Sequence, residues 1–484
     1  MKNLPFFYNK EPIKFIKKFE KTSTGSFTKS NSNVLSDISN VKLSYKKKEF
    51  VAEFNYFDIL SKERTISTGN QIKNVYFKNK KELIFDNMFV GGISVSSKKG
   101  ETSSVKGYIG RIQSANFKEN NKQYYKLVVP LKKKLDFFFV IEGSHYSNDF
   151  GFNSTSSIKT ELSNETFFII NEKDKNKKEF LIIESNTKQT FEEFSNKTFS
   201  IRVVLGYTTG LFSGNRGYYF GYNDKEKKSF INFRFDKLRN ETRGFLNPTN
   251  SNPYSWIRNI DRDKAEKLYK SNSLKPISSI TFSTLCNKAI EDDDFLSVLL
   301  LIIESNTASL IFKSGGYSIA LESLADIIIG DKKEKLSPIT SKSENKKFRE
   351  DLMCVLNKYR ENEHFQDFET LEGRINQINQ VTNRERLKMP FKILDIELLE
   401  EDIKVINSRN DFLHGRVPNY RNIEGIRSID SKDKDLYYAS VRLYTLLNML
   451  ILKYVGYENY VLNFSKIFEN GTTYLVDEDF HRKV

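Results

Sequence analysis

Residues 240–255 read NETRGFLNPTNSNPYS, a stretch with one glycine, two prolines and many small polar side chains. Proline has no backbone N–H to donate to a sheet or a helix, and Asn, Ser and Thr form local turns, so such a stretch is typical of a linker. The spacing of apolar residues differs on its two sides. The stretch therefore predicts a boundary between two domains, which we expect to comprise residues 1–250 and 256–484.

Before the linker, short runs of apolar, β-branched and aromatic residues alternate with turn clusters rich in Asn, Ser, Gly and Lys. Runs about ten residues apart, with no helical pattern between them, are typical of antiparallel strands. We expect strands at residues 81–97, 124–131, 135–143, 165–171, 179–185 and 199–207. The glycine-rich residues 206–221 lack the GK[ST] ending of a phosphate loop and predict a hairpin. Residues 1–250 are thus predicted to be an antiparallel β-rich domain, a sandwich or an open barrel.

After the linker, apolar residues recur every three or four positions, as expected for helices that bury one face. One such face begins at Leu296, another includes Tyr317 and Leu321, and the longest covers residues 433–455. The polar residues 331–347 are expected to connect two helices. The C-terminal domain is therefore predicted to be an all-α helical bundle, and the whole chain an α+β protein.

The charge of the chain is unevenly distributed. Of a formal net charge of +15, residues 1–250 contribute +17, with 43 Lys and Arg against 26 Asp and Glu. Residues 251–484 contribute −2, with 34 Lys and Arg against 36 Asp and Glu. A general bias towards lysine would raise the charge of both halves and not of residues 1–250 alone. The division indicates two domains with different surfaces, of which the basic one is suited to attract nucleic acid.

Cysteines and apolar runs exclude several classes of protein. Cys286 and Cys354 fall in helical patterns without a CxxC pair, which predicts buried thiols and neither a zinc site nor a disulfide framework. The N-terminus lacks the apolar run of a signal peptide, and the longest apolar run, residues 295–303, is too short to span a bilayer. We expect a cytoplasmic protein with no membrane association, no metal and no cofactor.

Residues 406–420, INSRNDFLHGRVPNY, contain one of the four histidines in the chain. A helix continuing from Glu400 would place Asn410 and His414 on one face, with Arg409 beside them. The glycine and proline that follow end the helix, whose C-terminus favours a protonated imidazole. Imidazole, guanidinium and amide together can move a proton and hold a phosphate, which suits the cleavage of RNA without a metal.

Such cleavage needs both an acid and a base, and the motif supplies one histidine. Two chains with their motifs facing each other would supply the second, so we expect a homodimer or a higher homo-oligomer. The structural alternative is that Arg409 pairs with a nearby carboxylate such as Glu401 and that His414 merely ends a helix. Glu322 lies in another predicted helix, and nothing in the sequence places it near the motif.

Other candidate residues have simpler interpretations. His145, His364 and His481 have no second histidine at metal-ligand spacing. We expect His145 to be structural or at the surface, His364 to lie on a solvated face and His481 to lie in a mobile tail. Trp256 is expected to pack the two halves together, and the acidic residues 291–294 are expected to open a helix.

The stretch RNDFLHGR (409–416), inside predicted helices and followed by a long final helix, resembles the HEPN superfamily. The signature of that superfamily is Arg, a polar residue that is often Asn, three or four further residues and then His. Residues 383–415, NRERLKMPFKILDIELLEEDIKVINSRNDFLHG, resemble the HEPN domains of Apea-like prokaryotic defence proteins, which follow a β-rich half. The resemblance covers residues 280–460; in the first half only the layout is similar.

The resemblance implies an HEPN-like bundle and a metal-independent endoribonuclease that works as a dimer and leaves cyclic phosphate ends. It also implies a toxin-like role in anti-phage defence by abortive infection, with a phage-derived or other activating ligand for the β-rich domain. Carried over residue by residue, Arg409, Asn410 and His414 are the catalytic residues. Arg416 extends the basic edge towards substrate phosphate, or is a solvated surface charge.

Two alternatives to a ribonuclease stay open. In one, a non-catalytic HEPN-type module dimerises or binds RNA while the β-rich domain recognises a protein or carbohydrate ligand. In the other, the β-rich domain is a carbohydrate or protein binder with an incidental helical tail. The complete set of Arg, Asn and His favours the enzyme, because a module that only binds has no chemical need for all three.

Overall fold

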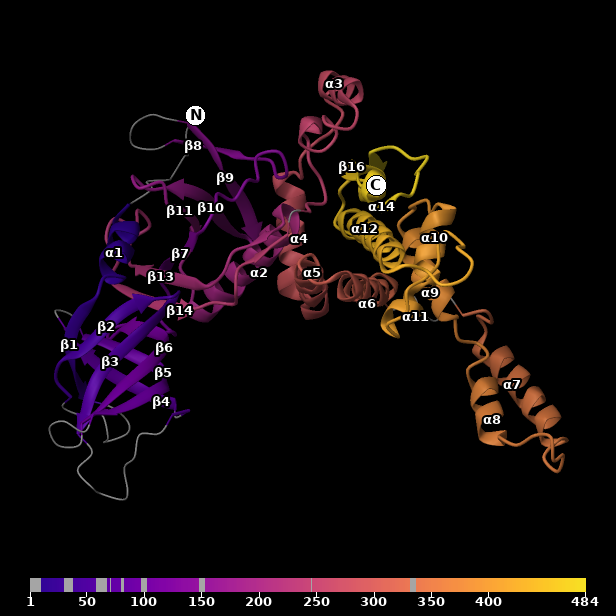
Figure 1. Cartoon of the computed structure of the whole chain (residues 1–484), viewed down its shortest axis with the longest axis horizontal. Coiled ribbons are helices and arrows are strands. Elements are labelled where there is room, and N and C mark those ends of the chain that lie inside the picture. The colour runs from indigo at the N-terminus through magenta and orange to yellow at the C-terminus, as the bar shows by residue number, and fades with distance from the viewer. Residues whose placement is uncertain are drawn as a thin grey trace. The chain divides into compact units, whose positions relative to one another are not determined.

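The computed structural model of the chain describes residues 10–29, 38–57, 68–69, 71–79, 82–96, 102–147, 153–244, 246–330 and 337–484. The chain forms two compact units: residues 1–252 with 276–292, and residues 253–275 with 293–484. An antiparallel β-sheet domain thus precedes a helical region, which confirms an α+β protein (Figure 1). The chain passes between the units three times, at residues 252, 275 and 292, whereas the sequence predicts one boundary.

A six-stranded barrel forms the first part of the N-terminal unit. Its strands are β1 (Ser23–Lys29), β2 (Val41–Lys46), β3 (Glu49–Phe57), β4 (Gln71–Lys78), β5 (Glu82–Ser96) and β6 (Thr102–Ser114). They pair in the order β3-β2-β1-β4-β5-β6, and β6 also pairs with β3. This last pairing closes the ring, so the barrel is closed, where the sequence predicts a sandwich or an open barrel.

The sheet continues beyond the barrel through antiparallel strands. In spatial order these are β14 (Asn232–Lys237), β13 (Arg216–Tyr222), β7 (Tyr124–Leu131), β11 (Glu179–Ser185), β10 (Glu165–Lys173), β9 (Asn153–Leu162) and β8 (Ser144–Ser147). β12 (Leu211–Phe212) and β15 (Thr242–Arg243) form a separate pair. Strands β5, β7, β10 and β11 confirm four of the six predicted runs.

Two predicted strands are wrong. Residues 135–143 form turns, with a single bridge between Ile141 and Ile277. Residues 199–207 lie in helix α2 (Phe191–Thr209), which begins with a capping box between Thr190 and Glu193. Nearly every residue in its second half is buried. A helix covered on all sides shows a continuous apolar run, which is also the signal of a buried strand.

The expected hairpin at 206–221 is also wrong. Gly210 ends α2 with φ 73°, and the chain continues through β12 into β13. A Cβ at position 210 would lie 2.7 Å from the carbonyl oxygen of Leu246, so this turn requires glycine. Further along the chain, α4 (Ser279–Glu291) returns to the first unit, where the amide of Glu161 on β9 donates to the hydroxyl of Ser283 at 3.0 Å.

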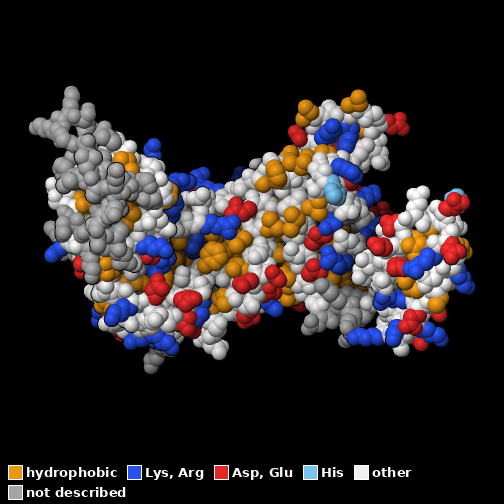
Figure 2. Space-filling model, turned by 90° about the horizontal axis from the view of Figure 1, so that it is seen from below, with side chains coloured by type: hydrophobic (Ala, Val, Ile, Leu, Met, Phe, Trp, Pro, Cys, Tyr) orange, Lys and Arg blue, Asp and Glu red, His pale blue; other side chains and the backbone are white. Residues whose placement is uncertain are grey.

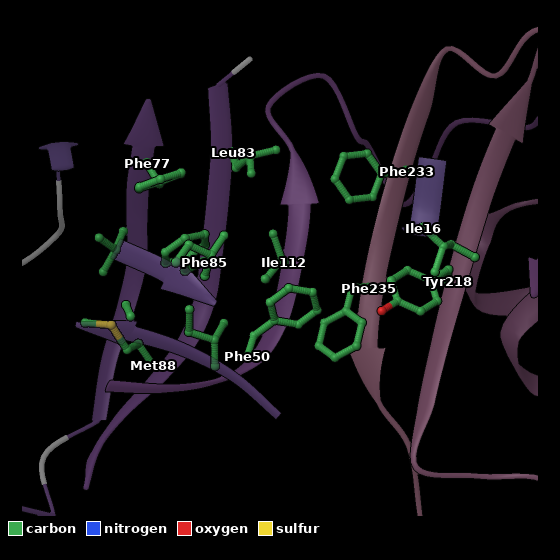
Figure 3. Packing of buried hydrophobic residues seen from close by; sticks show 14 of the residues in the cluster. Ile16, Phe50, Phe77, Leu83, Phe85, Met88, Ile112, Tyr218, Phe233 and Phe235 are labelled. Atoms are coloured by element: carbon green, nitrogen blue, oxygen red, sulfur yellow. The ribbon is translucent and has the colours of Figure 1, made fainter. Parts of the chain in front are cut away.

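Phenylalanine rings fill the barrel and its join to β13 and β14 (Figure 3). Phe50 is 0% exposed, and its ring centroid lies 5.0 Å from those of Phe19 and Tyr45 and 4.8 Å from that of Phe235. Helix α1 (Glu11–Phe19) adds Ile13 and Ile16 to the same core. The barrel and the open sheet therefore share one apolar core.

The second unit is built around α12 (Ile429–Tyr454), which buries almost every residue after Lys434 and contacts α6, α10 and α13. Its elements are η2 (Pro253–Ser255), α3 (Arg262–Ser271), α5 (Asp293–Ser305), α6 (Leu310–Ile329), α7 (Lys342–Asn357), α8 (Phe368–Asn376), α9 (Asn383–Ile393), α10 (Glu400–Asn407), α11 (Arg409–Leu413), α13 (Phe464–Ile467), α14 (Glu469–Thr472), and the pair β16 (Tyr460–Leu462) and β17 (His481–Lys483). The predicted helical faces fall in α5, α6 and α12.

The expected connector, residues 331–347, is described only in part. Residues 331–336 lie outside the described residues, and α7 begins at Lys342. Within the described part of the chain, no helix is long and apolar enough to cross a membrane.

The core assignment predicts a large effect of Phe50→Ala. Removing a fully buried ring leaves a cavity, so we expect the free energy of unfolding of the first unit to fall by about 3–5 kcal/mol. Phe89→Ala, at a ring of β5 that is 50% exposed, is the matched control and should cost about 0.5 kcal/mol or less. Urea unfolding is followed by far-UV circular dichroism, while fluorescence of the single tryptophan, Trp256, reports on the second unit. Equal losses in the two variants would contradict the assignment.

Candidate active site

The Arg-Asn-His motif lies on one short helix, α11, and on His414, the residue that caps its C-terminus. α10 ends at Asn407, and Ser408, with φ −79° and ψ 1°, separates it from α11. The Ser408 hydroxyl donates to the carbonyl of Lys404 at 2.9 Å, as serine often does at a helix end. The predicted continuous helix is therefore interrupted. Asn410 and His414 still lie one turn apart, because the His414 amide donates to the Asn410 carbonyl at 3.1 Å.

The motif helix ends where the sequence predicts. Gly415 has φ 69°, and its amide donates to the Phe412 carbonyl at 3.1 Å, while the Arg416 amide donates to the Asp411 carbonyl at 2.7 Å. These two bonds are those of a Schellman motif. Phe412 is 3% exposed and anchors the helix, whereas the side chain of His414 is exposed, as are those of Asn410 and Arg416.

Arg409 is held by a carboxylate from another helix. Its Nη2 forms an ion pair with Oε1 of Glu322 on α6, and its Nη1 donates to Oδ1 of Asn410 at 2.6 Å. The side chains of Arg409 and Glu322 are only 15% and 18% exposed, so salt screens this pair less than a surface pair. Glu401, the partner expected in the structural alternative, pairs with Lys404 at 2.6 Å instead.

A second arginine extends this arrangement along α6. Nη1 of Arg386 on α9 donates to the two carboxylate oxygens of Asp326 at 2.7 and 2.9 Å. Nη2 of Arg386 lies 3.7 Å from Oε1 of Glu322. Glu322 and Asp326 are one turn apart on a helix that is otherwise largely apolar, and that spacing is the sequence signal that marks such a row. With Arg409, the row holds two positive and two negative charges.

The loop after the motif is fixed by a buried aspartate. Arg427 donates to the carbonyls of Val417 and Pro418 at 2.5 and 2.6 Å and to Oδ2 of Asp435 at 2.8 Å. Asp435, on α12, is 0% exposed and also lies 3.4 Å from Nε of Arg421. A loop without regular structure thereby has a defined path against α12.

The other histidines occupy unrelated positions. His364 is exposed in the turn between α7 and α8, as predicted. His145 lies in β8, but its side chain is outside the described part of the structure, so its expected role stays a prediction. His481 lies in β17 opposite Leu462, so the expectation of a mobile tail is wrong. Burial lowers the pKa of His481 from 6.5 to about 4.

The remaining predictions have mixed outcomes. Cys286 is buried, which raises the pKa of its thiol, but Cys354 is exposed on α7, so the expectation of two buried thiols is half wrong. Trp256 packs on Phe464 and Phe468 within the second unit. Asp293 and Asp294 do open α5. Among the residues that the structure describes, no group of three or more His, Cys, Asp or Glu side chains is placed to hold a metal ion.

The charged side chains do not form a continuous basic tract on the face seen in Figure 2, where Lys and Arg are interspersed with Asp and Glu.

Comparisons with models of protein families, with curated proteins and with solved structures find no match to this chain.

The partly buried His481 predicts a pH dependence of stability. Its pKa of about 4 in the folded state lies below its ordinary value of 6.5, so between these pH values the unfolded chain binds the extra proton. The stability of the second unit should therefore fall as the pH is lowered from 6.5 towards 4. We expect a smaller fall in His481→Gln and an unchanged fall in His364→Gln, measured by urea titration of Trp256 fluorescence at pH 7 and pH 5. Identical profiles for His481→Gln and the wild type would exclude a folded state in which His481 is neutral.

Proposed function

We propose that this chain is a metal-independent endoribonuclease of the HEPN type, with Arg409, Asn410 and His414 as its catalytic residues. One observation carries the proposal: these three residues share one short helix and its C-terminal cap. There the guanidinium is fixed between Glu322 and Asn410 while the imidazole is exposed. An exposed imidazole is open to substrate and can accept or donate a proton, and an oriented guanidinium suits a phosphate.

In the proposed reaction, the ribose 2′-oxygen attacks the neighbouring phosphorus, and the bond from phosphorus to the 5′-oxygen breaks. The 2′-hydroxyl gives its proton to a base, and the leaving 5′-oxygen takes one from an acid, which yields a 2′,3′-cyclic phosphate and a 5′-hydroxyl. His414 would perform one of these proton transfers. Arg409 would stabilise the charge that builds on the phosphate oxygens, and Arg416 would contact a neighbouring phosphate.

A homodimer is part of the proposal, because one imidazole does not serve as acid and base in the same step. The motif helix, the loop after it and the first residue of α12 carry exposed apolar side chains: Leu413 is 39% exposed, Ile426 102% and Ile429 80%. Several such side chains close together in the sequence favour a surface that another protein covers. A second copy seated there would bring a second His414 towards the first.

The proposed biological role rests on the resemblance of residues 409–416 to HEPN proteins. In that role the chain cleaves RNA in the cytoplasm during abortive infection, once the β-rich unit has met an activating ligand such as a phage component.

The test is RNA cleavage in EDTA by the purified wild type and His414→Ala. We expect the wild type to leave 2′,3′-cyclic phosphate ends and His414→Ala to lose at least about a hundredfold in rate, because the proton transfer is lost. His364→Ala, at an exposed histidine outside the motif, is the control and should keep full activity. Cleavage by His414→Ala at the wild-type rate would refute the assignment. If the purified wild type cleaves no RNA, the same point is tested in cells. We then expect overexpressed wild type to be toxic and overexpressed His414→Ala not to be.

Glu322 is a positioning residue in this proposal, and Glu322→Gln tests it. The substitution keeps the size of the side chain and removes the charge that orients Arg409, so we expect kcat to fall about tenfold or more. Asp326→Asn is the matched control, since Asp326 pairs with Arg386 and lies one turn further along α6. Equal activity of both variants, or equal loss in both, would show that Glu322 does not position Arg409 for the reaction.

A further inference from the structure

A cavity of about 320 Å³ opens in the first unit where α1 meets the barrel. Its apolar lining consists of four phenylalanines and one leucine: Phe15, Phe19, Phe77, Phe233 and Leu83. We call it the phenylalanine pocket. Figure 3 shows Phe77 on β4, Leu83 on β5 and Phe233 on β14 at one end of the shared core. Its volume is within the range of sites for small molecules.

The rings from α1 are incompletely buried. Phe77 and Phe233 are 0% and 2% exposed, but Phe15 and Phe19 are only half-buried against them. The ring centroid of Phe15 lies 4.7 Å from that of Phe233 and 5.4 Å from that of Phe19. Accessible aromatic faces and edges at a concave surface favour a flat aromatic guest, which makes stacked and edge-to-face contacts there.

The rim of the pocket is positively charged. Lys18 and Lys21 line it, both are exposed, and neither forms an ion pair within the described part of the chain. The charges of two neighbouring residues are neutralised by ion pairs. Lys17 pairs with Asp174 at 2.6 Å, and Glu20, which caps α1, lies 3.3 Å from Nε of Arg216. The described lining residues include no acid. An anionic group at the rim would therefore meet two positive charges and no negative one.

We propose that the phenylalanine pocket binds a small aromatic anion, whose ring system lies on the phenylalanines and whose carboxylate, sulfonate or phosphate lies between Lys18 and Lys21. Ser23 and Asn79, which also line the pocket, offer a hydroxyl and an amide that would orient the guest. A nucleotide and an aromatic carboxylic acid share this chemistry.

A second cavity of the first unit lacks the positively charged rim that favours an anion. It measures about 360 Å³ and lies beside Phe89 and Tyr108, but its lining contains Glu49 paired with Lys237, so its rim is neutral overall. All described lining residues of the phenylalanine pocket belong to the first unit, and the Arg-Asn-His motif belongs to the second. The binding proposal therefore does not depend on RNA cleavage.

The experiment is a fluorescence titration of the full chain with anilinonaphthalene sulfonate, an anion with a flat naphthalene ring system. We expect saturable binding and an increase of the Kd by about tenfold in the double variant Lys18→Gln/Lys21→Gln, because both rim charges are lost. Lys14→Gln, at an exposed lysine of α1 that does not line the pocket, is the matched control and should leave the Kd unchanged. Ser23→Phe adds a ring to the cavity and should abolish binding, with circular dichroism confirming that each variant is folded.

Competition identifies the source of the anion. Displacement of the probe by adenosine monophosphate more strongly than by naphthoate points to a nucleotide, and the reverse order points to an aromatic acid. Either order supports the proposal. A Kd that is unchanged in Lys18→Gln/Lys21→Gln or in Ser23→Phe would overturn it. So would equal displacement by a neutral aromatic alcohol, or displacement by decanoate alone, since neither compound combines a ring with a negative charge.

Discussion

The ion pair between Arg442 of α12 and Asp402 of α10 determines how the second unit is assembled. The two side chains are 1% and 0% exposed and meet at 2.8 Å. Burying such charges costs several kcal/mol unless every donor and acceptor is satisfied. Arg442 also donates to Glu478 at 2.5 Å, and Asp402 also accepts from Arg482 at 2.9 Å. The observed arrangement of α10, α12 and the C-terminal segment pairs all four groups with one another, and α10 leads directly into the motif helix.

Three arginines in the second unit each hold a short helix or a loop against a neighbouring element. A helix as short as α11 is unstable by itself, and the loop after it has few backbone hydrogen bonds of its own. Arg442 fixes α10, Arg409 fixes α11 to α6, and Arg427 fixes the loop to Asp435. A guanidinium presents several donors in one plane, so each arginine bridges segments that backbone pairing does not join. The position of His414 therefore depends on side-chain ion pairs rather than on a long helix.

The sequence predicts well what is encoded locally. Strand β7 coincides with the predicted run 124–131, and the end of the motif helix follows from the Gly-Arg-Val-Pro sequence after His414. It fails where burial removes periodicity, as in α2, whose continuous apolar run resembles that of a strand.

It also fails where the partner is distant in the chain. The pairing of β6 with β3 closes the barrel, and Glu322 reaches Arg409 from another helix, yet neither has a local signature. The residues of the motif could be proposed together because they are neighbours in sequence. The spacing of Glu322 and Asp326 marks an acidic pair on an apolar helix, but nothing local identifies Arg409 as a partner of that pair.

The pairing of Arg409 with Glu322 bears on how a phosphate could bind in the proposed reaction. A guanidinium that already has a carboxylate partner attracts an anion less than a free one does, and the row of Glu322, Asp326, Arg386 and Arg409 has no net charge. The affinity for RNA must then come from charges outside this row. Arg416 is exposed two residues beyond His414, and apposed motifs in a dimer would bring two copies of it to one cleft. The same apposition would supply both imidazoles, so the acid, the base and the phosphate-binding charge all depend on the second copy.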